Sequence, residues 1–173
     1  MRRLRYGVAM SLDGYIAGPK GEADWIVMDP EIDFDAMWSE FDTLLMGRHT
    51  FTAMAGGGGS TGAMKIVVAS RTLDPRDHPG VTIVSDNLKP AVTALKNEPG
   101  KDIWLFGGGE LFRSLLDLGL VDRIEVAVIP VVLGQGIPLL APGARRTRLT
   151  LTSHRVYGKT GTVSLVYDVK KKR

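Results

Sequence analysis

The sequence contains no cysteine, and this absence excludes disulfide bonds, thiolate catalysis and cysteine-based metal sites. Histidine is scarce as well. The three histidines, His49, His78 and His154, are far apart and lie in unrelated contexts, whereas a histidine-rich metal site needs ligands at close, regular spacing. We therefore expect no metal site in this protein.

Long apolar runs are also absent, since none approaches the roughly 20 residues that span a bilayer. The chain begins basic at Arg2 and Arg3, but Arg5 follows and no apolar core of a secretory signal comes after it. We expect a cytoplasmic protein with no membrane partner.

Charge of either sign is not in large excess, because the formal net charge is only +3. Four positive charges form the terminal run of residues 170–173, which is typical of a frayed, solvated end. A modest positive surplus fits an anionic ligand as well as it fits nucleic acid. Basic residues are not interleaved with aromatic ones in a stripe, however, so we do not expect nucleic acid as a partner.

Strand-like and helix-like segments alternate through the first two thirds of the chain. Short apolar runs predict strands over residues 5–10, 43–46, 66–69, 81–84, 103–106 and 124–132. Apolar side chains at helical spacing predict helices over residues 32–41, 88–97 and 111–118. Two later strand-like runs, residues 149–156 and 163–169, flank a turn and predict a hairpin.

This alternation predicts an α/β fold with three layers, α/β/α, around a mixed, mostly parallel sheet that ends in a C-terminal antiparallel hairpin. A chain of 173 residues suits one hydrophobic core, and no linker or shift in composition divides it. We therefore expect a single domain over residues 1–173.

Ligands of open α/β sheets bind beyond the carboxyl ends of the strands, and the first strand end that favours an anion is formed by residues 46–50. Gly47 lets the chain turn tightly into a helix, whose free N–H groups attract phosphate. Arg48 and Thr50 add donors. The alternative is a capped helix that carries a surface arginine.

Two further strand ends have the same character. At the second, glycines 107–109 allow phosphates to approach the backbone, and the alternative is a tight turn that packs a helix on a strand. At the third, the Ser70 hydroxyl and the Arg71 guanidinium suit a phosphate, and the alternative is a solvated loop. The combination matches a pyrophosphate and a further 2′-phosphate, which favours NADPH over NADH.

A run of four glycines at residues 56–59, followed by Ser60, also resembles a phosphate loop at first sight. A phosphate loop of the P-loop type needs a Lys-Ser or Lys-Thr pair directly after the glycines, and that pair is absent. We interpret this run as a flexible surface loop.

The three strand ends resemble the dihydrofolate reductase superfamily. The sequence Met-Gly-Arg-His-Thr at residues 46–50, Ser-Arg at 70–71 and Gly-Gly-Gly at 107–109 occur in the same order and rough spacing in folate reductases. This resemblance implies a dihydrofolate reductase-like fold that binds NADPH.

Three other segments resemble one branch of that superfamily, which contains the reductase domain of riboflavin biosynthesis. They are residues 9–17, residues 121–123 before a strand, and the stretch Pro-Val-Val-Leu-Gly-Gln-Gly-Ile-Pro-Leu at residues 130–139. The resemblance to the superfamily thus covers nearly the whole chain.

The resemblance implies a role in binding NADPH for each matching position. Ala9 and Ile16 would flank the nicotinamide. The pyrophosphate and 2′-phosphate side would be lined by Gly47, Arg48, His49 and Thr50, and the 2′-phosphate would be held by Ser70 and Arg71. The pyrophosphate would be cradled from the other side by Gly107, Gly108, Gly109, Glu110 and Leu111.

The substrate half departs from the folate reductases. Folate reductases carry a threonine in the strand after the glycines and a tyrosine in the helix between, where this chain has Ala127 and Phe112. They also place a carboxylate on the first helix, and none can be matched here with certainty. These departures weaken a folate assignment.

Candidate catalytic carboxylates are Asp13, Asp33 and Asp35. A turn role for Asp13 and helix capping for the other two are the alternatives. Trp25 and Trp38 are candidates for the walls of a substrate pocket, although the helical spacing of Trp38 also fits a place in the core.

The expected function is an NADPH-dependent reductase that transfers hydride to a small heterocyclic substrate, similar to the pyrimidine reductase of riboflavin biosynthesis. A dihydrofolate reductase and a non-catalytic NADPH-binding protein are the alternatives. We also expect a homodimer, because reductases of the riboflavin-like branch are often dimeric. The apolar run at residues 126–133 fits either a dimer contact or the core.

Overall fold

A computed structural model describes residues 1–56 and 62–170 of the chain. Most of the glycine run that we expected to form a surface loop (residues 57–59, with Ser60) lies outside the described residues, as do residues 171–173 of the basic terminus. The strands are β1 (Leu4–Ser11), β2 (Tyr15–Ala17), β3 (Phe41–Gly47), β4 (Lys65–Ala69), β5 (Val81–Val84), β6 (Asp102–Gly107), β7 (Arg123–Ile129), β8 (Ile137–Pro138), β9 (Leu149–Tyr157) and β10 (Thr162–Val169). The helices are α1 (Phe34–Ser39), α2 (Arg48–Gly56), α3 (Leu88–Asn97) and α4 (Gly109–Asp117), with a 3-10 turn at Pro75–Asp77.

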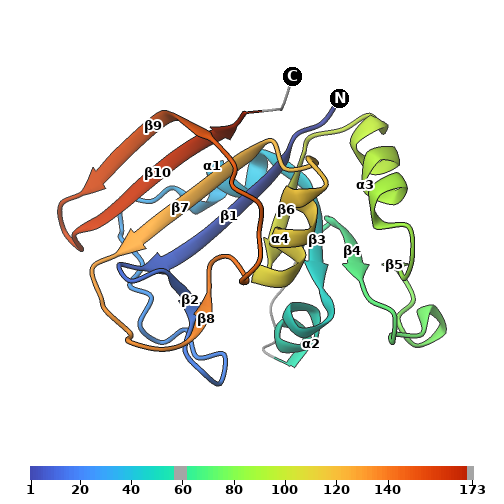
Figure 1. Cartoon of the computed structure of the whole chain (residues 1–173), viewed down its shortest axis with the longest axis horizontal. Coiled ribbons are helices and arrows are strands. Elements are labelled where there is room, and N and C mark those ends of the chain that lie inside the picture. Colours follow the sequence, from blue (N-terminus) through green and yellow to red (C-terminus); the bar gives the residue numbers. More distant parts are fainter. Residues whose placement is uncertain (57–61, 171–173) are drawn as a thin grey trace.

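Eight of the strands form one sheet in the order β5-β4-β3-β6-β1-β7-β10-β9. Figure 1 shows this sheet from β5 at one edge to the long β9 at the other. The strands from β5 to β7 are parallel to their neighbours, whereas β10 runs antiparallel to both β7 and β9. The predicted mixed, mostly parallel sheet with a C-terminal antiparallel hairpin is confirmed.

Helices cover both faces of the sheet. Side chains alternate between the two faces along each strand, so apolar side chains lie on both faces and each face needs a covering layer. On one face, Leu4 and Tyr6 of β1 pack with Val92 of α3 and Leu115 of α4. A second cluster on the opposite face joins Leu44, Met46 and Trp104 of the sheet to α2 through Phe51 and to α1 through Met37. The three-layer α/β/α arrangement is therefore as predicted.

The structure differs from the sequence-based prediction at several boundaries. The strand expected over residues 124–132 ends at Ile129, because Pro130 has no N–H to donate to a neighbouring strand. The first helix is shorter than expected, beginning at Phe34 after its N-cap residue Asp33. A small antiparallel pair, β2 with β8, was not predicted and links the loop after β1 to the segment after β7.

Within residues 1–56 and 62–170, no helix has the length and apolar character needed to cross a membrane. The same residues contain no group of three or more His, Asp or Glu side chains suited to hold a metal ion.

Candidate functional site

The three strand ends that favour anions lie side by side, because they are the carboxyl ends of neighbouring parallel strands. Strand β3 is placed between β4 and β6. In this register Gly47 pairs with Ala69 of β4, and Met46 pairs with Gly107 of β6. Because the strands are parallel, the residues that follow them, including Arg48 and Ser70, leave the sheet on the same side. The fold thus brings together donors from three distant parts of the sequence.

The end of β6 approaches the start of α2 closely. Gly107 has a φ of +146°, a conformation that favours glycine, and a Cβ there would lie 3.2 Å from the Thr50 hydroxyl oxygen. The next peptide bond, between Gly107 and Gly108, is cis. Thr50 therefore lies close to both Gly107 and Gly108, since a Cβ on either would come within 4 Å of its hydroxyl oxygen.

Helix α4 begins at this site, and no side chain of the described residues caps its first N–H groups. Its N-cap residue is Gly108, and no side-chain oxygen of the N-cap binds the first turn. The N–H groups at the start of a helix, together with the helix dipole, attract anions. Glu110 in the first turn is exposed, and Leu111 packs against the core.

Gly109 has a separate, structural reason to be glycine. A Cβ at this position would lie 2.7 Å from the Pro138 carbonyl oxygen and 3.3 Å from that of Leu139. The start of α4 is therefore held against the segment after β8 at a distance that only glycine allows. The third glycine of the triplet serves helix packing, which was the alternative considered for this run.

The loop after β4 is shaped by Ser70. Its side chain is buried, and its hydroxyl oxygen accepts hydrogen bonds from the backbone N–H of Thr72 at 3.2 Å and of Leu73 at 3.1 Å. The adjacent Arg71 is exposed, and its guanidinium has no hydrogen-bond or ion-pair partner among the residues that the structure describes. Ser70 thus fixes the turn from which Arg71 projects.

Arg48 and His49 at the start of α2 are both exposed. Their side chains lie beside one another, with Arg48 Nη2 3.4 Å from His49 Nε2. Both therefore stay accessible to a ligand that lies along the strand ends.

Asp13 ties two loops together after β1. Its carboxylate accepts hydrogen bonds from the Ser11 hydroxyl at 2.7 Å and from the backbone N–H groups of Leu133 at 3.1 Å and Gly134 at 2.7 Å. The Ser11 bond, joined by these backbone bonds, holds the pKa of Asp13 below its ordinary value. Asp13 is therefore ionised at neutral pH and has no proton to donate there.

Ala9 and Ile16, the positions expected to flank the nicotinamide, lie before and after Asp13 in the chain. Ala9 precedes it on β1 and pairs with Ala127 of β7, and Ile16 follows it on β2. Both Ala9 and Ile16 are partly exposed.

The carboxylates of the first helix also have structural surroundings. Asp33 is the N-cap of α1, and its Oδ1 accepts a hydrogen bond from the Ala36 N–H at 2.9 Å. Asp35 lies in the first turn, where a negative charge is favourable to the helix dipole, and its side chain is exposed. These contacts match the capping alternative, and a catalytic role for either residue stays a prediction.

The two tryptophans proposed as pocket walls differ in their surroundings. The Trp38 ring lies 4.6 Å from that of Trp104 and 6.3 Å from that of Phe106, measured between ring centroids. Trp38 therefore packs on the second core cluster, partly exposed at its edge. Trp25 is partly exposed, and its Nε1 donates to the Glu22 carbonyl at 3.1 Å.

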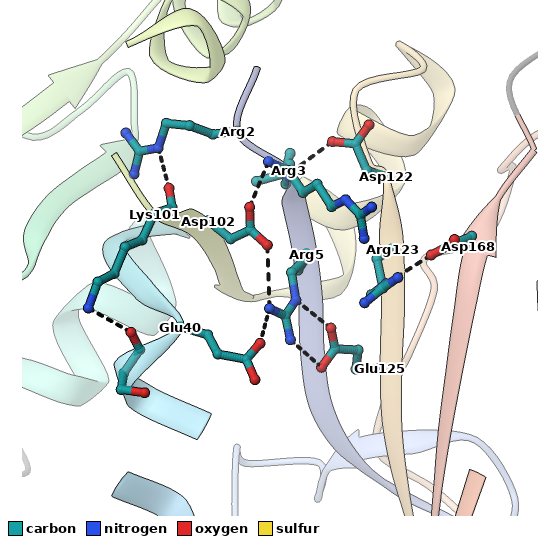
Figure 2. A network of polar contacts seen from close by, with 12 residues as sticks. Arg2, Arg3, Arg5, Glu40, Lys101, Asp102, Asp122, Arg123, Glu125 and Asp168 are labelled. Carbon is teal, nitrogen blue, oxygen red and sulfur yellow. Dashed lines mark hydrogen bonds and ion pairs between the residues drawn. The ribbon is translucent and has the colours of Figure 1, made fainter. Parts of the chain in front are cut away.

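Sequence reasoning missed a network of charged side chains at the opposite, amino end of the strands. Figure 2 shows Arg5 of β1 pointing toward Glu125 of β7, with Glu40 and Asp102 nearby. Burial lowers the pKa of Arg5, but the hydrogen bonds that its guanidinium donates to Glu125 and Glu40 outweigh this effect and hold the pKa above its ordinary value. The signal in the sequence was an arginine within an apolar strand segment, because a buried guanidinium needs an acidic partner.

The comparisons with known proteins identify the family. Residues 2–163 match the model of the RibD C-terminal domain. The chain belongs to the RibD C-terminal domain family. The uncharacterized protein YyaP of Bacillus subtilis (strain 168) is 36% identical to this chain over 179 aligned residues. The alignment covers 96% of this chain and 94% of YyaP.

Solved structures share the fold. A putative riboflavin biosynthesis protein from Shewanella sp. PV-4 superposes with a TM-score of 0.84 at 25% identity, covering 99% of this chain and 100% of that one. Dihydrofolate reductase from Enterococcus faecalis, solved with NADP(H), superposes with a TM-score of 0.72 at 18% identity, covering 98% and 97%. The dihydrofolate reductase-like fold is therefore confirmed, and family and fold together support a reductase of the riboflavin and dihydrofolate reductase type.

Proposed function

We propose that this RibD C-terminal domain protein is an NADPH-dependent reductase that transfers hydride to a small heterocyclic substrate. The observation that carries the proposal is the register that sets the ends of β4, β3 and β6 side by side. The carboxyl ends of these strands then present the starts of α2 and α4, together with the basic side chains of Arg48 and Arg71, to a single ligand. A dinucleotide with an extra phosphate carries the negative charges that such a set of donors binds.

The cofactor-binding residues divide by the part of NADPH they would hold. The uncapped N–H groups of α4 and the start of α2 suit the pyrophosphate, since both helix ends carry partial positive charge. Gly47 leaves room for a ligand, because a Cβ there would meet no atom within 4 Å. Arg71, held by the Ser70 turn, suits the 2′-phosphate, which NADH lacks.

The chain's own contribution to the reaction is positional. NADPH, when bound, supplies the hydride. Ala9 and Ile16 would leave an apolar surface for the nicotinamide. The hydrogen bonds that Asp13 accepts from the backbone hold the loop between them against residues 133–134. Asp13, being ionised, serves as a positioning residue in this scheme and not as a proton donor at neutral pH.

The first experiment is an isothermal titration with NADPH and NADH. We expect NADPH to bind at least about tenfold more tightly, because a charged phosphate contact is worth more than about 1.4 kcal/mol. Equal affinities for the two cofactors would remove the assigned role of Arg71. Absence of binding by either would overturn the proposal.

Turnover then identifies the substrate. We expect NADPH oxidation with a pyrimidine intermediate of riboflavin biosynthesis and little with dihydrofolate, because Ala127 and Phe112 replace residues typical of folate reductases. Phe112 lacks the hydroxyl of a tyrosine, and its ring stacks on Tyr6 in the core at 3.9 Å between centroids, so it offers no polar group to a substrate. Faster turnover of dihydrofolate would favour a folate reductase. Tight NADPH binding without oxidation over a panel of heterocycles would favour a non-catalytic binding protein.

The expected homodimer stays a prediction. The apolar run that fits a dimer contact is largely β7, which lies inside the sheet between β1 and β10 and is accounted for by the core. Light scattering on the purified protein tests the oligomeric state directly.

A further inference from the structure

An apolar groove lies on the α4 face of the sheet, beside that helix. It has a volume of about 530 Å³. Its floor is formed by Val126 of β7 and Leu165 of β10, one wall by Phe112 of α4, and the other by Leu140 and Ala144 of the segment between β8 and β9. Figure 1 shows that segment passing along the sheet next to α4. The volume of the apolar groove is usual for small-molecule sites.

A basic hollow of about 760 Å³ continues from the apolar groove, and the two share Leu116, Arg145 and Arg146 among their lining residues. The basic hollow is also lined by Arg148 and Lys170. One end of the combined cavity is therefore apolar, and the other is positively charged.

The cations that line the basic hollow are Arg145, Arg146, Arg148 and Lys170. Among the described residues, no carboxylate forms an ion pair with the side chains of Arg145, Arg146, Arg148 or Lys170. The acidic residue of the basic hollow is Asp117, whose Oδ1 accepts a hydrogen bond from the Arg145 backbone N–H at 3.0 Å. Asp117 thus holds the backbone, and the positive charge of the basic hollow has no ion-pair partner within residues 1–56 and 62–170.

We propose that the apolar groove and the basic hollow together bind an amphipathic anion, a small molecule with an apolar body and one carboxylate, sulfonate or phosphate group. The apolar body lies between Leu140 and Leu165, where its burial is favourable. The anionic group meets the guanidinium groups of Arg146 and Arg148, which bind planar and tetrahedral oxyanions through paired hydrogen bonds.

This site is separate from the proposed cofactor site and does not depend on the proposed function. Met10 lines the apolar groove, whereas its neighbour Ala9 points to the opposite face of the sheet, because side chains alternate along a strand. The cofactor residues at the ends of β3 and β4 lie beyond β6 and β1 in the sheet. Those of α4 stand at the start of that helix, whereas the basic hollow is lined by Leu116 and Asp117 at its end. An anion in the basic hollow and NADPH at the strand ends are therefore compatible.

A pair of fluorescent probes tests the proposal on the whole protein. 8-Anilinonaphthalene-1-sulfonate has an apolar body with one anionic group, and N-phenyl-1-naphthylamine has the same rings without the charge. We expect the double variant Arg146→Gln/Arg148→Gln to weaken binding of the sulfonate by about tenfold or more and to change binding of the neutral probe by less than about twofold. The glutamine retains most of the side-chain stem, so packing changes little.

Two further variants test whether the effect of charge is local and whether the probes bind in the apolar groove. Lys20→Gln/Lys89→Gln removes the same charge at exposed positions elsewhere, and we expect it to leave both probes bound as in the parent protein. Ala144→Trp fills the apolar groove from one wall, and we expect it to weaken both probes. Unfolding curves of each variant establish that the fold is retained.

Three results would overturn the proposal. One is equal binding of the sulfonate probe by the parent and the arginine double variant. Another is complete displacement of that probe by saturating NADP⁺, which would place it at the cofactor site. The third is a dimer by light scattering that takes up either probe only on dilution to monomer, which would assign the apolar groove to a second copy of the chain.

Discussion

Arg5 and Glu125 face one another across the neighbouring strands β1 and β7. The guanidinium Nε lies 2.5 Å from one carboxylate oxygen of Glu125, and Nη2 lies 3.0 Å from the other. Only 8% of the Arg5 side chain is exposed, so its charge needs these partners. The pair (Figure 2) links two central strands near their amino ends, whereas the candidate cofactor site lies at the carboxyl ends of β3, β4 and β6.

Replacing Glu125 by glutamine should destabilise the fold. The substitution removes one carboxylate from a buried guanidinium, while Glu40 and Asp102 retain their contacts with Arg5. We expect Glu125→Gln to lower the free energy of unfolding by about 2 kcal/mol, measured by urea denaturation at neutral pH. The control is Glu31→Gln, which alters an exposed carboxylate near Arg155 and should cost less than about 1 kcal/mol. Equal losses in the two variants would contradict the special role of Glu125.

The same pair shows where prediction from the sequence stops. The helix over residues 88–97 was predicted with the bounds that α3 has, because its apolar spacing and the Pro-Gly stop are local features. Arg5 and Glu125 are 120 residues apart, and no local pattern states which strands become neighbours. The three strand ends were found because glycines and basic residues follow apolar runs locally. Their adjacency came only from the order of strands in the sheet.

The role of Asp13 was also beyond local reasoning. Its position before Gly14 predicts a turn residue, and it does lie in the turn after β1. Its bonds to Leu133 and Gly134 join that turn to a loop more than a hundred residues later in the chain, which the spacing of residues does not reveal.

Asp13 should make the protein more sensitive to acid. Its pKa in the folded state lies below the ordinary value, so its ionised form stabilises the fold. That contribution is fully present above the ordinary pKa of about 3.9 and is lost as pH falls through the lower folded pKa. In urea titrations at a series of pH values, Asp13→Asn should therefore lose less stability than the parent as the solution is acidified through this range. Parallel curves for the parent and Asp13→Asn would refute the assignment.

Gly109 should not tolerate a side chain. A Cβ there would lie 2.7 Å from the Pro138 carbonyl oxygen, so either α4 or the segment after β8 must shift. We expect Gly109→Ala to lower the free energy of unfolding by about 1–3 kcal/mol. The matched control is Gly158→Ala, because a Cβ at Gly158 meets no atom within 4 Å and its effect should stay within about 0.5 kcal/mol. A stable Gly109→Ala protein with unchanged unfolding would show that the contact yields without cost.

Arg71 should distinguish the two nicotinamide cofactors. Its guanidinium is exposed beside the strand ends and is free of protein partners within the described residues, so its removal leaves the fold undisturbed. We expect Arg71→Ala to weaken NADPH binding by about tenfold to a hundredfold and NADH binding by less than about twofold, because only NADPH carries the 2′-phosphate. The control is Arg76→Ala, an exposed arginine in the same loop that pairs with Asp74 and should leave both affinities unchanged. Titration calorimetry measures all four affinities. If Arg71→Ala weakened NADPH and NADH equally, Arg71 would contact a part of the cofactor that both share, and the selection of NADPH would have to come from other residues.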